Sequence, residues 1–272
     1  LQYGVVNIYQ NWERWPQQPM YACSDVGNCV NPSQLKPEDM PSNEETIAIA
    51  NDFLNEYAIS KEGYAAPRVV DQSNWRILYE QAPADQKSSI YIPDQVQVVY
   101  PLTLEGKEVY DEGGSVYGLS VMVDVRTKRV SNASELTSKQ FERSDYKGET
   151  DGKRIIKIAE NGGFRNSLYI DPNSRKVELK LGAPKIEMVK IYYSSDNYRT
   201  NSDLYMPAMV FPIENWKEAG YWRKNVIVPL VKSILDTDVQ SQPQPMPVDI
   251  PVSSPSVQGA TEPAVMPENV AR

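Results

Sequence analysis

The segment from Val69 to Val130 restricts the fold more than any other part of this sequence, because β-branched and aromatic residues recur there with a period of two. That period is typical of strands with one buried face. Turn residues at Glu105-Gly106 and at Asp111–Gly114 favour an antiparallel meander over crossover connections. We predict strands at Trp75–Tyr79, Val96–Tyr100 and Leu119–Val125.

A helix is expected before these strands. Ser42-Asn43-Glu44-Glu45 has the pattern of a capping box, in which the Ser42 hydroxyl accepts from a free N–H and Glu45 reaches back. Apolar residues then recur at helical spacing up to Gly63, which predicts a helix that covers one face of the sheet. The predicted apolar stripe is Ile47, Ala50, Phe53, Leu54 and Tyr57.

A second round of helix and strands follows. Asp151 is expected to cap a short helix that carries Ile155, Ile158 and Ala159 and ends at Gly162-Gly163. Pro207 and Pro212 remove ladder donors, so we expect the strand that contains them to lie at an edge or to be interrupted. The segment from Lys224 to Leu235 predicts a strand before Pro229 and a short helix or turn after it. The strands expected in between are Leu168–Ile170, Val177–Leu181, Ile186–Tyr193 and Leu204–Phe211.

The two ends of the chain differ from this body. An alternating strand at Tyr3–Tyr9 leads into a loop in which Cys23 and Cys29, the only cysteines, flank Gly27 and Asn28 and predict a disulfide. Such a bond implies an oxidising compartment, whereas free thiols in a cytosolic protein are the alternative. Residues 238–272 are rich in proline and lack aromatic residues, which predicts a disordered tail or spacer; a polyproline ligand is the alternative.

These patterns together predict an α+β protein built from two helix-on-antiparallel-sheet units. The expected organisation is an N-terminal strand and cysteine-stapled loop at 1–41, a first unit at 42–148, a second unit at 149–237 and the tail at 238–272.

Composition excludes several classes of chemistry. The chain has no histidine, so it holds no serine–histidine or cysteine–histidine nucleophile system and no histidine-ligated metal. Two cysteines are too few for the usual four-ligand zinc site, and we predict no metal and no cofactor. A net charge of −8 opposes binding to nucleic acid or to an anionic membrane.

The helix near Ser42, the strands after it and the octet Val123-Asp-Val-Arg-Thr-Lys-Arg-Val130 resemble the PepSY-type domain over residues 42–136. The family's last hairpin has a turn glycine where this chain has Lys128. A partial echo of the octet, Ile170-Asp-Pro-Asn-Ser-Arg-Lys-Val177, suggests two related units, although an ordinary hairpin explains both octets. The resemblance implies a non-enzymatic regulatory or protein-contacting module on the outer side of a bacterial membrane.

We therefore predict a non-catalytic extracytoplasmic protein that contacts another cell-envelope or surface protein. Because the chain begins at Leu1, we expect membrane association only through a segment outside it, such as a signal peptide or anchor. Aromatic side chains are the predicted contacts, since their rings have large apolar faces and polar tips. These candidates are Trp12, Trp15, Trp216, Tyr221 and Trp222.

Three alternatives remain open at this point. The same aromatic residues suit a carbohydrate-binding module, in which exposed rings stack on sugars. A structural role in a surface assembly also fits the composition. An enzyme would have to be a two-carboxylate hydrolase of the glycosidase type, with Glu13, Asp124, Asp171 and Glu214 as nameable acids.

Overall fold

The computed structural model describes residues 6–10, 22–23, 29–30, 35–71, 74–137, 139–165, 178–194, 201–219, 221 and 223–241. Helices and strands follow one another in a mixed order that confirms the α+β class. In chain order they are β1 (Ile8–Tyr9), β2 (Ala22–Cys23), β3 (Cys29–Val30), the 3-10 turn η1 (Pro37–Asp39), α1 (Asn43–Glu56), β4 (Arg68–Val69), α2 (Asn74–Gln81), η2 (Lys87–Ser89), β5 (Gln95–Pro101), β6 (Thr103–Leu104), β7 (Lys107–Tyr110), β8 (Gly118–Asp124), β9 (Arg129–Ser134), α3 (Gly152–Glu160), β10 (Lys185–Ser194), β11 (Asn201–Pro212), β12 (Asn225–Pro229) and α4 (Lys232–Ser241).

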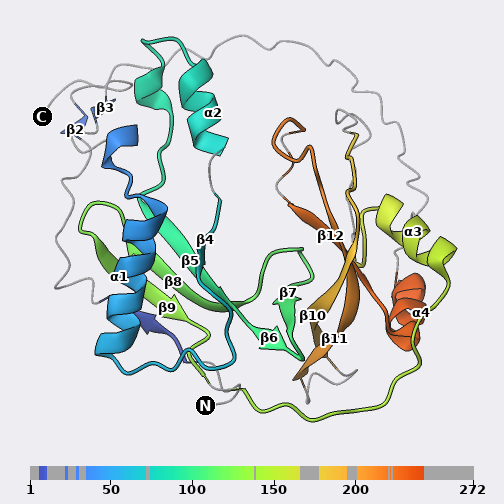
Figure 1. The fold of residues 1–272 in the computed structure, drawn as a ribbon. Coiled ribbons are helices and arrows are strands. Elements are labelled where there is room, and N and C mark those ends of the chain that lie inside the picture. The colour runs from blue at the N-terminus through green and yellow to red at the C-terminus, as the bar shows by residue number, and fades with distance from the viewer. Residues whose placement is uncertain are drawn as a thin grey trace, which may run out of the picture.

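The described strands form two five-stranded sheets and one small ribbon of β2 and β3. The first sheet has the order β1-β9-β8-β5-β4 and is antiparallel throughout. The second has the order β12-β11-β10-β7-β6 and is mixed, because β10 pairs parallel with β7. Helix α1 covers the first sheet, whereas α3 and α4 lie together beside the second (Figure 1).

Helix α1 begins at the predicted N-cap, but only half of the predicted capping box is present, because the Glu45 carboxylate pairs with Lys128. Ser42 is the N-cap and its hydroxyl accepts a hydrogen bond of 3.1 Å from the Glu45 amide. Ala50 and Leu54 are fully buried against β5, β8 and β9, so this helix and sheet share one apolar core. Tyr57 does not join the core as predicted: it is the C-cap residue, is 56% exposed and packs on Phe53.

The predicted strand Trp75–Tyr79 is wrong, because these residues belong to helix α2. Trp75 and Tyr79 are four residues apart and therefore share one helix face, and both contact a small apolar cluster with Leu35. Ile77 on the opposite face and Leu78 at the flank of this face are exposed. A period near four was mistaken for a period of two over a segment too short to separate them.

The hairpin of β6 and β7 leaves the first sheet and joins the second. Its tight turn lies at Glu105-Gly106, as predicted, and both residues have positive φ. The chain then returns to the first sheet at Gly118, where a β-carbon would lie 2.0 Å from the Tyr100 carbonyl oxygen. Only glycine permits this close approach. The meander predicted for residues 69–130 is therefore interrupted by two strands that belong to the other sheet.

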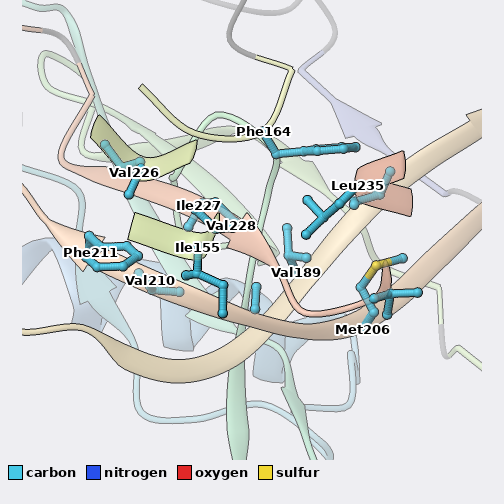
Figure 2. Packing of buried hydrophobic residues seen from close by; sticks show 14 of the residues in the cluster. Ile155, Phe164, Val189, Met206, Val210, Phe211, Val226, Ile227, Val228 and Leu235 are labelled. Carbon is cyan, nitrogen blue, oxygen red and sulfur yellow. The ribbon is translucent and has the colours of Figure 1, made fainter. Parts of the chain in front are cut away.

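The second core lies between β10–β12 and the helices α3 and α4. Asp151 caps α3 through hydrogen bonds from the Lys153 and Arg154 amides, and Gly162-Gly163 follows the helix, as predicted. Ile155 of α3 and Leu235 of α4 point toward the buried valines of the sheet (Figure 2). Residues 238–241 are helical, so the tail predicted from residue 238 begins with the last turn of α4.

Strand β11 corrects the prediction drawn from its prolines. It is continuous from residue 201 to residue 212 and lies between β10 and β12 rather than at an edge. The Pro207 carbonyl accepts a hydrogen bond from the Leu230 amide, so the backbone polar groups of Pro207 face β12. The pairing of β11 with β12 ends next to this position, at Pro229, so the absence of an N–H on Pro207 breaks no pair of the ladder. Pro212 is the last residue of the strand. Each of the two prolines therefore lies at an end of the pairing between β11 and β12.

Several predicted segments fall wholly or partly outside the described residues. The N-terminal strand is described only at Ile8–Tyr9, which pairs with β9. The strand Leu168–Ile170, the octet at 170–177 and the tail beyond residue 241 are not described. Residues 178–180 form no strand, and Leu181 makes a single bridge with Ile213. The predicted strands at 186–193, 204–211 and before Pro229 are confirmed.

Candidate functional site

The β8–β9 turn is the most tightly specified loop of the first sheet. Asp124 ends β8 and its carboxylate Oδ1 accepts from the Thr127 amide at 2.7 Å and from the Thr127 hydroxyl at 2.8 Å. The Lys128 amide donates to the Asp124 carbonyl at 3.0 Å. Lys128 itself has a φ of 54°, the left-handed conformation that a glycine adopts most easily. These bonds hold the backbone of the turn in place.

The 3-10 turn η1 provides the facing surface. The Asp39 carboxylate accepts from the Lys36 amide at 2.8 Å, which fixes the start of the turn. Leu35 is buried just before it and contacts Trp75, Val96 and Val125. Glu38 and Asp39 project from η1 as exposed carboxylates.

Between these two turns lies a pocket of about 430 Å³ that is open to solvent. We call it the hairpin pocket. It is lined by two buried apolar side chains, by acidic side chains of η1 and by basic side chains of the β8–β9 turn. These residues are Leu35, Glu38, Asp39, Val125, Arg126 and Lys128.

The two basic side chains of the hairpin pocket differ in their bonding. Lys128 Nζ lies 3.1 Å from the Glu45 carboxylate of α1. Arg126 Nε is buried and has no hydrogen-bond partner among the described residues. Arg126 lines the pocket without a carboxylate partner among the described residues, which distinguishes its guanidinium from the paired Lys128 amine.

A second polar cluster lies between the two sheets, and we call it the inter-sheet network. The Tyr117 hydroxyl donates to Glu135 Oε2 at 2.5 Å and accepts from Lys139 at 2.7 Å and Lys190 at 3.1 Å. Lys190 also pairs with Asp203 at 3.1 Å. Its two lysines and two carboxylates balance in charge, so the network joins β10 and β11 to the ends of β8 and β9 and offers no surplus charge to a ligand.

Burial and hydrogen bonding shift the ionisation of this network in opposite directions. Burial raises the pKa of the Tyr117 phenol, and its hydrogen bond to Glu135 raises it further. Burial also works against the Glu135 carboxylate, but bonds from Lys139 and Tyr117 outweigh it and lower the pKa of Glu135 overall. Tyr117 is therefore neutral and Glu135 ionised near neutral pH, which suits a structural joint.

The predicted aromatic site is described only in part. Trp12, Trp15 and Trp222 lie outside the described residues. Trp216 and Tyr221 are partly buried and both pack against the second core. The amines of Lys217 and Lys224 lie 5.2 Å and 4.8 Å from the centre of the Trp216 ring.

The same two lysines connect Trp216 to the first sheet. Lys217 Nζ pairs with the Asp71 carboxylate at 3.0 Å, and Lys224 Nζ donates to the Asp71 carbonyl at 2.8 Å. Burial lowers the pKa of Lys224. A sugar that stacked where these two amines lie over the Trp216 ring would have to displace them from their bonds to Asp71.

The acids named for a hydrolase do not form a described pair. Glu13 and Asp171 lie outside the described residues. Asp124 is 5% exposed and its carboxylate bonds the turn at Thr127. Glu214 follows β11 in the other sheet, where its amide donates to the Lys180 carbonyl.

The described residues contain no candidate metal site and no candidate membrane span. No three acidic or cysteine side chains within the described ranges come together as metal ligands. None of the helices in those ranges is both long and apolar enough to cross a bilayer.

Sequence reasoning identified the β8–β9 turn but not the hairpin pocket. The octet at 123–130 was singled out for its turn residues, and Arg126 was an unassigned position within it. The opposite wall comes from η1, almost ninety positions earlier in the chain, and no local pattern links the two. An excess of basic residues in a short turn was the only available signal.

Comparison with family models, with curated proteins and with solved structures found no match to this chain.

Proposed function

We propose that this protein is a non-catalytic recognition protein that acts outside the cytoplasm and binds another cell-envelope protein at the hairpin pocket. The observation that carries the proposal is the pocket itself: an open concavity with charged side chains of both signs on its walls, among them Arg126, which pairs with no carboxylate of the described residues. Open, mixed-polarity surfaces of this kind suit protein partners, whereas small-molecule sites are more enclosed and more apolar.

The resemblance to the PepSY-type domain supports this proposal. Helix α1 packs on antiparallel β5, β8 and β9, in the arrangement that the resemblance implies. The residue that replaces the family's turn glycine, Lys128, keeps a left-handed backbone. The hairpin pocket is built on this same turn, so the segment that carries the resemblance also carries the proposed site.

An oxidising compartment is the second part of the proposal. Strands β2 and β3 pair antiparallel with Cys23 directly opposite Cys29, which brings the two backbones to a separation that a disulfide spans. We expect no reactive thiol in the denatured, non-reduced protein and two after reduction. Two reactive thiols before reduction would reject the bond and remove this support for an extracytoplasmic location.

Site-specific photo-crosslinking tests the proposed function. The full chain, expressed in its native host with p-benzoylphenylalanine in place of Glu38, should form a light-dependent adduct with an envelope protein. The control places the same residue at Glu56, which is exposed at the other end of α1, roughly 15–20 Å along the helix axis from Glu45. Equal adducts at both positions, or none at Glu38, would contradict recognition at the hairpin pocket.

A further inference from the structure

We infer that the hairpin pocket binds a peptide segment of the partner that carries one carboxylate and one basic side chain, with the carboxylate against Arg126 and the base facing Glu38 and Asp39. This inference rests on the proposed function and specifies the chemistry of what is recognised there.

The basic wall accounts for the carboxylate. A guanidinium binds a carboxylate through two parallel N–H···O bonds. Arg126 lines the pocket and pairs with no carboxylate among the described residues, so its guanidinium can bind a carboxylate of the partner. Lys128 adds positive charge but already pairs with Glu45, which leaves Arg126 as the anchor.

The acidic wall accounts for the basic side chain and limits the charge of the ligand. Glu38 and Asp39 are exposed and face the basic wall across the pocket. A ligand with several carboxylates or a phosphate would meet Arg126 but would be repelled by these two acids. A segment with one charge of each sign is complementary to both walls at once.

The floor of the pocket is part of a packed apolar cluster and exposes little apolar surface to a ligand. Leu35 is 6% exposed and Val125 is 1% exposed, and both are packed into the cluster with Trp75 and Val96. The floor is therefore fixed before binding, which reduces the entropy cost of recognition. The charged walls, and not the floor, are the surfaces that contact the ligand.

Peptide titration followed by NMR of the full chain tests this inference. The probe is an acetylated and amidated eight-residue peptide that carries one aspartate and one lysine separated by two apolar residues. We expect it to shift the amide signals of Leu35, Lys36, Glu38 and Asp39 and of residues 124–129. Matched peptides with asparagine and glutamine, with two aspartates, or with phosphoserine in place of the aspartate should bind at least tenfold more weakly.

Variants of the protein test the roles of the two walls. Arg126→Gln should weaken binding of the aspartate–lysine peptide by tenfold or more, whereas Arg129→Gln, an exposed control on the same hairpin, should leave it unchanged. The double variant Arg126→Glu with Glu38→Lys should prefer the peptide in which the order of the two charges is reversed.

Three outcomes would overturn the inference: equal binding by wild type and Arg126→Gln, tighter binding of the two-aspartate or phosphoserine peptide, or no pocket shifts with any peptide. Crosslinking at Glu38 that persists under any of these outcomes would leave the proposed function standing and reject only this ligand chemistry. Loss of both would reject the site.

Discussion

Lys128 lies in the β8–β9 turn of the first sheet with a φ of 54°, a conformation that few residues with a β-carbon adopt. A left-handed backbone costs a residue with a β-carbon about 1–2 kcal/mol. Three hydrogen bonds to Asp124, from the Thr127 amide, the Thr127 hydroxyl and the Lys128 amide, hold the turn closed and offset that cost. Hydrogen bonds to Asp124 thus stabilise, without a glycine, a turn that glycine forms more easily.

Substitution of Lys128 tests this account of the turn. Lys128→Gly should leave the free energy of unfolding unchanged or raise it by up to about 1 kcal/mol, because relief of the left-handed strain exceeds the entropy that glycine adds to the unfolded chain. Lys128→Val should lower it by about 1–2 kcal/mol, since β-branched residues tolerate this conformation least. Both variants lose the exposed ion pair with Glu45, so that loss cancels in the comparison. Urea unfolding measures the difference, and equal values for the two variants would contradict the account.

Buried tyrosines make stability depend on alkaline pH. Burial raises the pKa of Tyr100 to about 12 from an ordinary value of 10.0, and its hydroxyl donates to Asn51 at 3.0 Å. The neutral phenol is favoured in the folded state, so its contribution to stability is complete below pH 10.0 and is lost as the pH rises toward about 12. Tyr100→Phe should flatten this alkaline decrease in the free energy of unfolding, whereas Tyr192→Phe, with an exposed ring, should not. Identical pH profiles for wild type and Tyr100→Phe would show that the pKa of Tyr100 is the same in the folded and unfolded states.

At the scale of the elements, helix α2 shows how burial decides what a short segment becomes. Its one apolar face carries Trp75 and Tyr79 and packs at the end of the first sheet. Trp75 is 7% exposed, whereas Leu78 at the flank of this face is 56% exposed. The two residues therefore make very different contributions, although both are large and apolar.

Alanine substitution separates these contributions. Trp75→Ala should lower the free energy of unfolding by about 3–5 kcal/mol, because it leaves a cavity below the hairpin pocket. Leu78→Ala should change it by no more than about 0.5 kcal/mol, since it removes an exposed side chain. Denaturant unfolding of both variants measures the difference. A comparable loss from Leu78→Ala would mean that the exposed side of α2 is covered in solution.

The elements also show what a sequence pattern can and cannot predict. Helices α1 and α3 were predicted from their caps, and β5, β8 and β10 from runs long enough to display their period. Helix α2 was missed because five residues do not separate a period of two from one near four. The central place of β11 was missed because its prolines matter only relative to where neighbouring ladders end.

The candidate site was less predictable than the fold for a related reason. Asp124 and Thr127 form a local turn that the sequence displays directly. The charge pattern of the hairpin pocket depends on η1 and the β8–β9 turn meeting in space, which is a tertiary property. The aromatic residues favoured by composition, Trp216 and Tyr221, are partly buried against the second core, and a binding role for them stays a prediction.

At the scale of the whole molecule, the two sheets are joined at several points. Strand β7 pairs with β10, and Leu102, Val109 and Met188 form an apolar cluster where the sheets meet. Arg68 of β4 makes two hydrogen bonds of 3.0 Å and 2.7 Å to Glu108 of β7. The inter-sheet network and the lysines at Asp71 add further bonds. The second sheet therefore stabilises the first sheet, which carries the hairpin pocket.

The central claim is that the protein binds an envelope protein through Arg126 and leaves that partner chemically unmodified. The most direct measurement is quantitative affinity purification from the native extracytoplasmic fraction, with wild type, Arg126→Glu and Arg129→Glu labelled with different isotopes. We predict an envelope protein that is recovered unmodified with wild type and Arg129→Glu and depleted at least tenfold with Arg126→Glu. Equal recovery with all three proteins, or recovery of a partner cleaved or altered by the wild type alone, would contradict the claim.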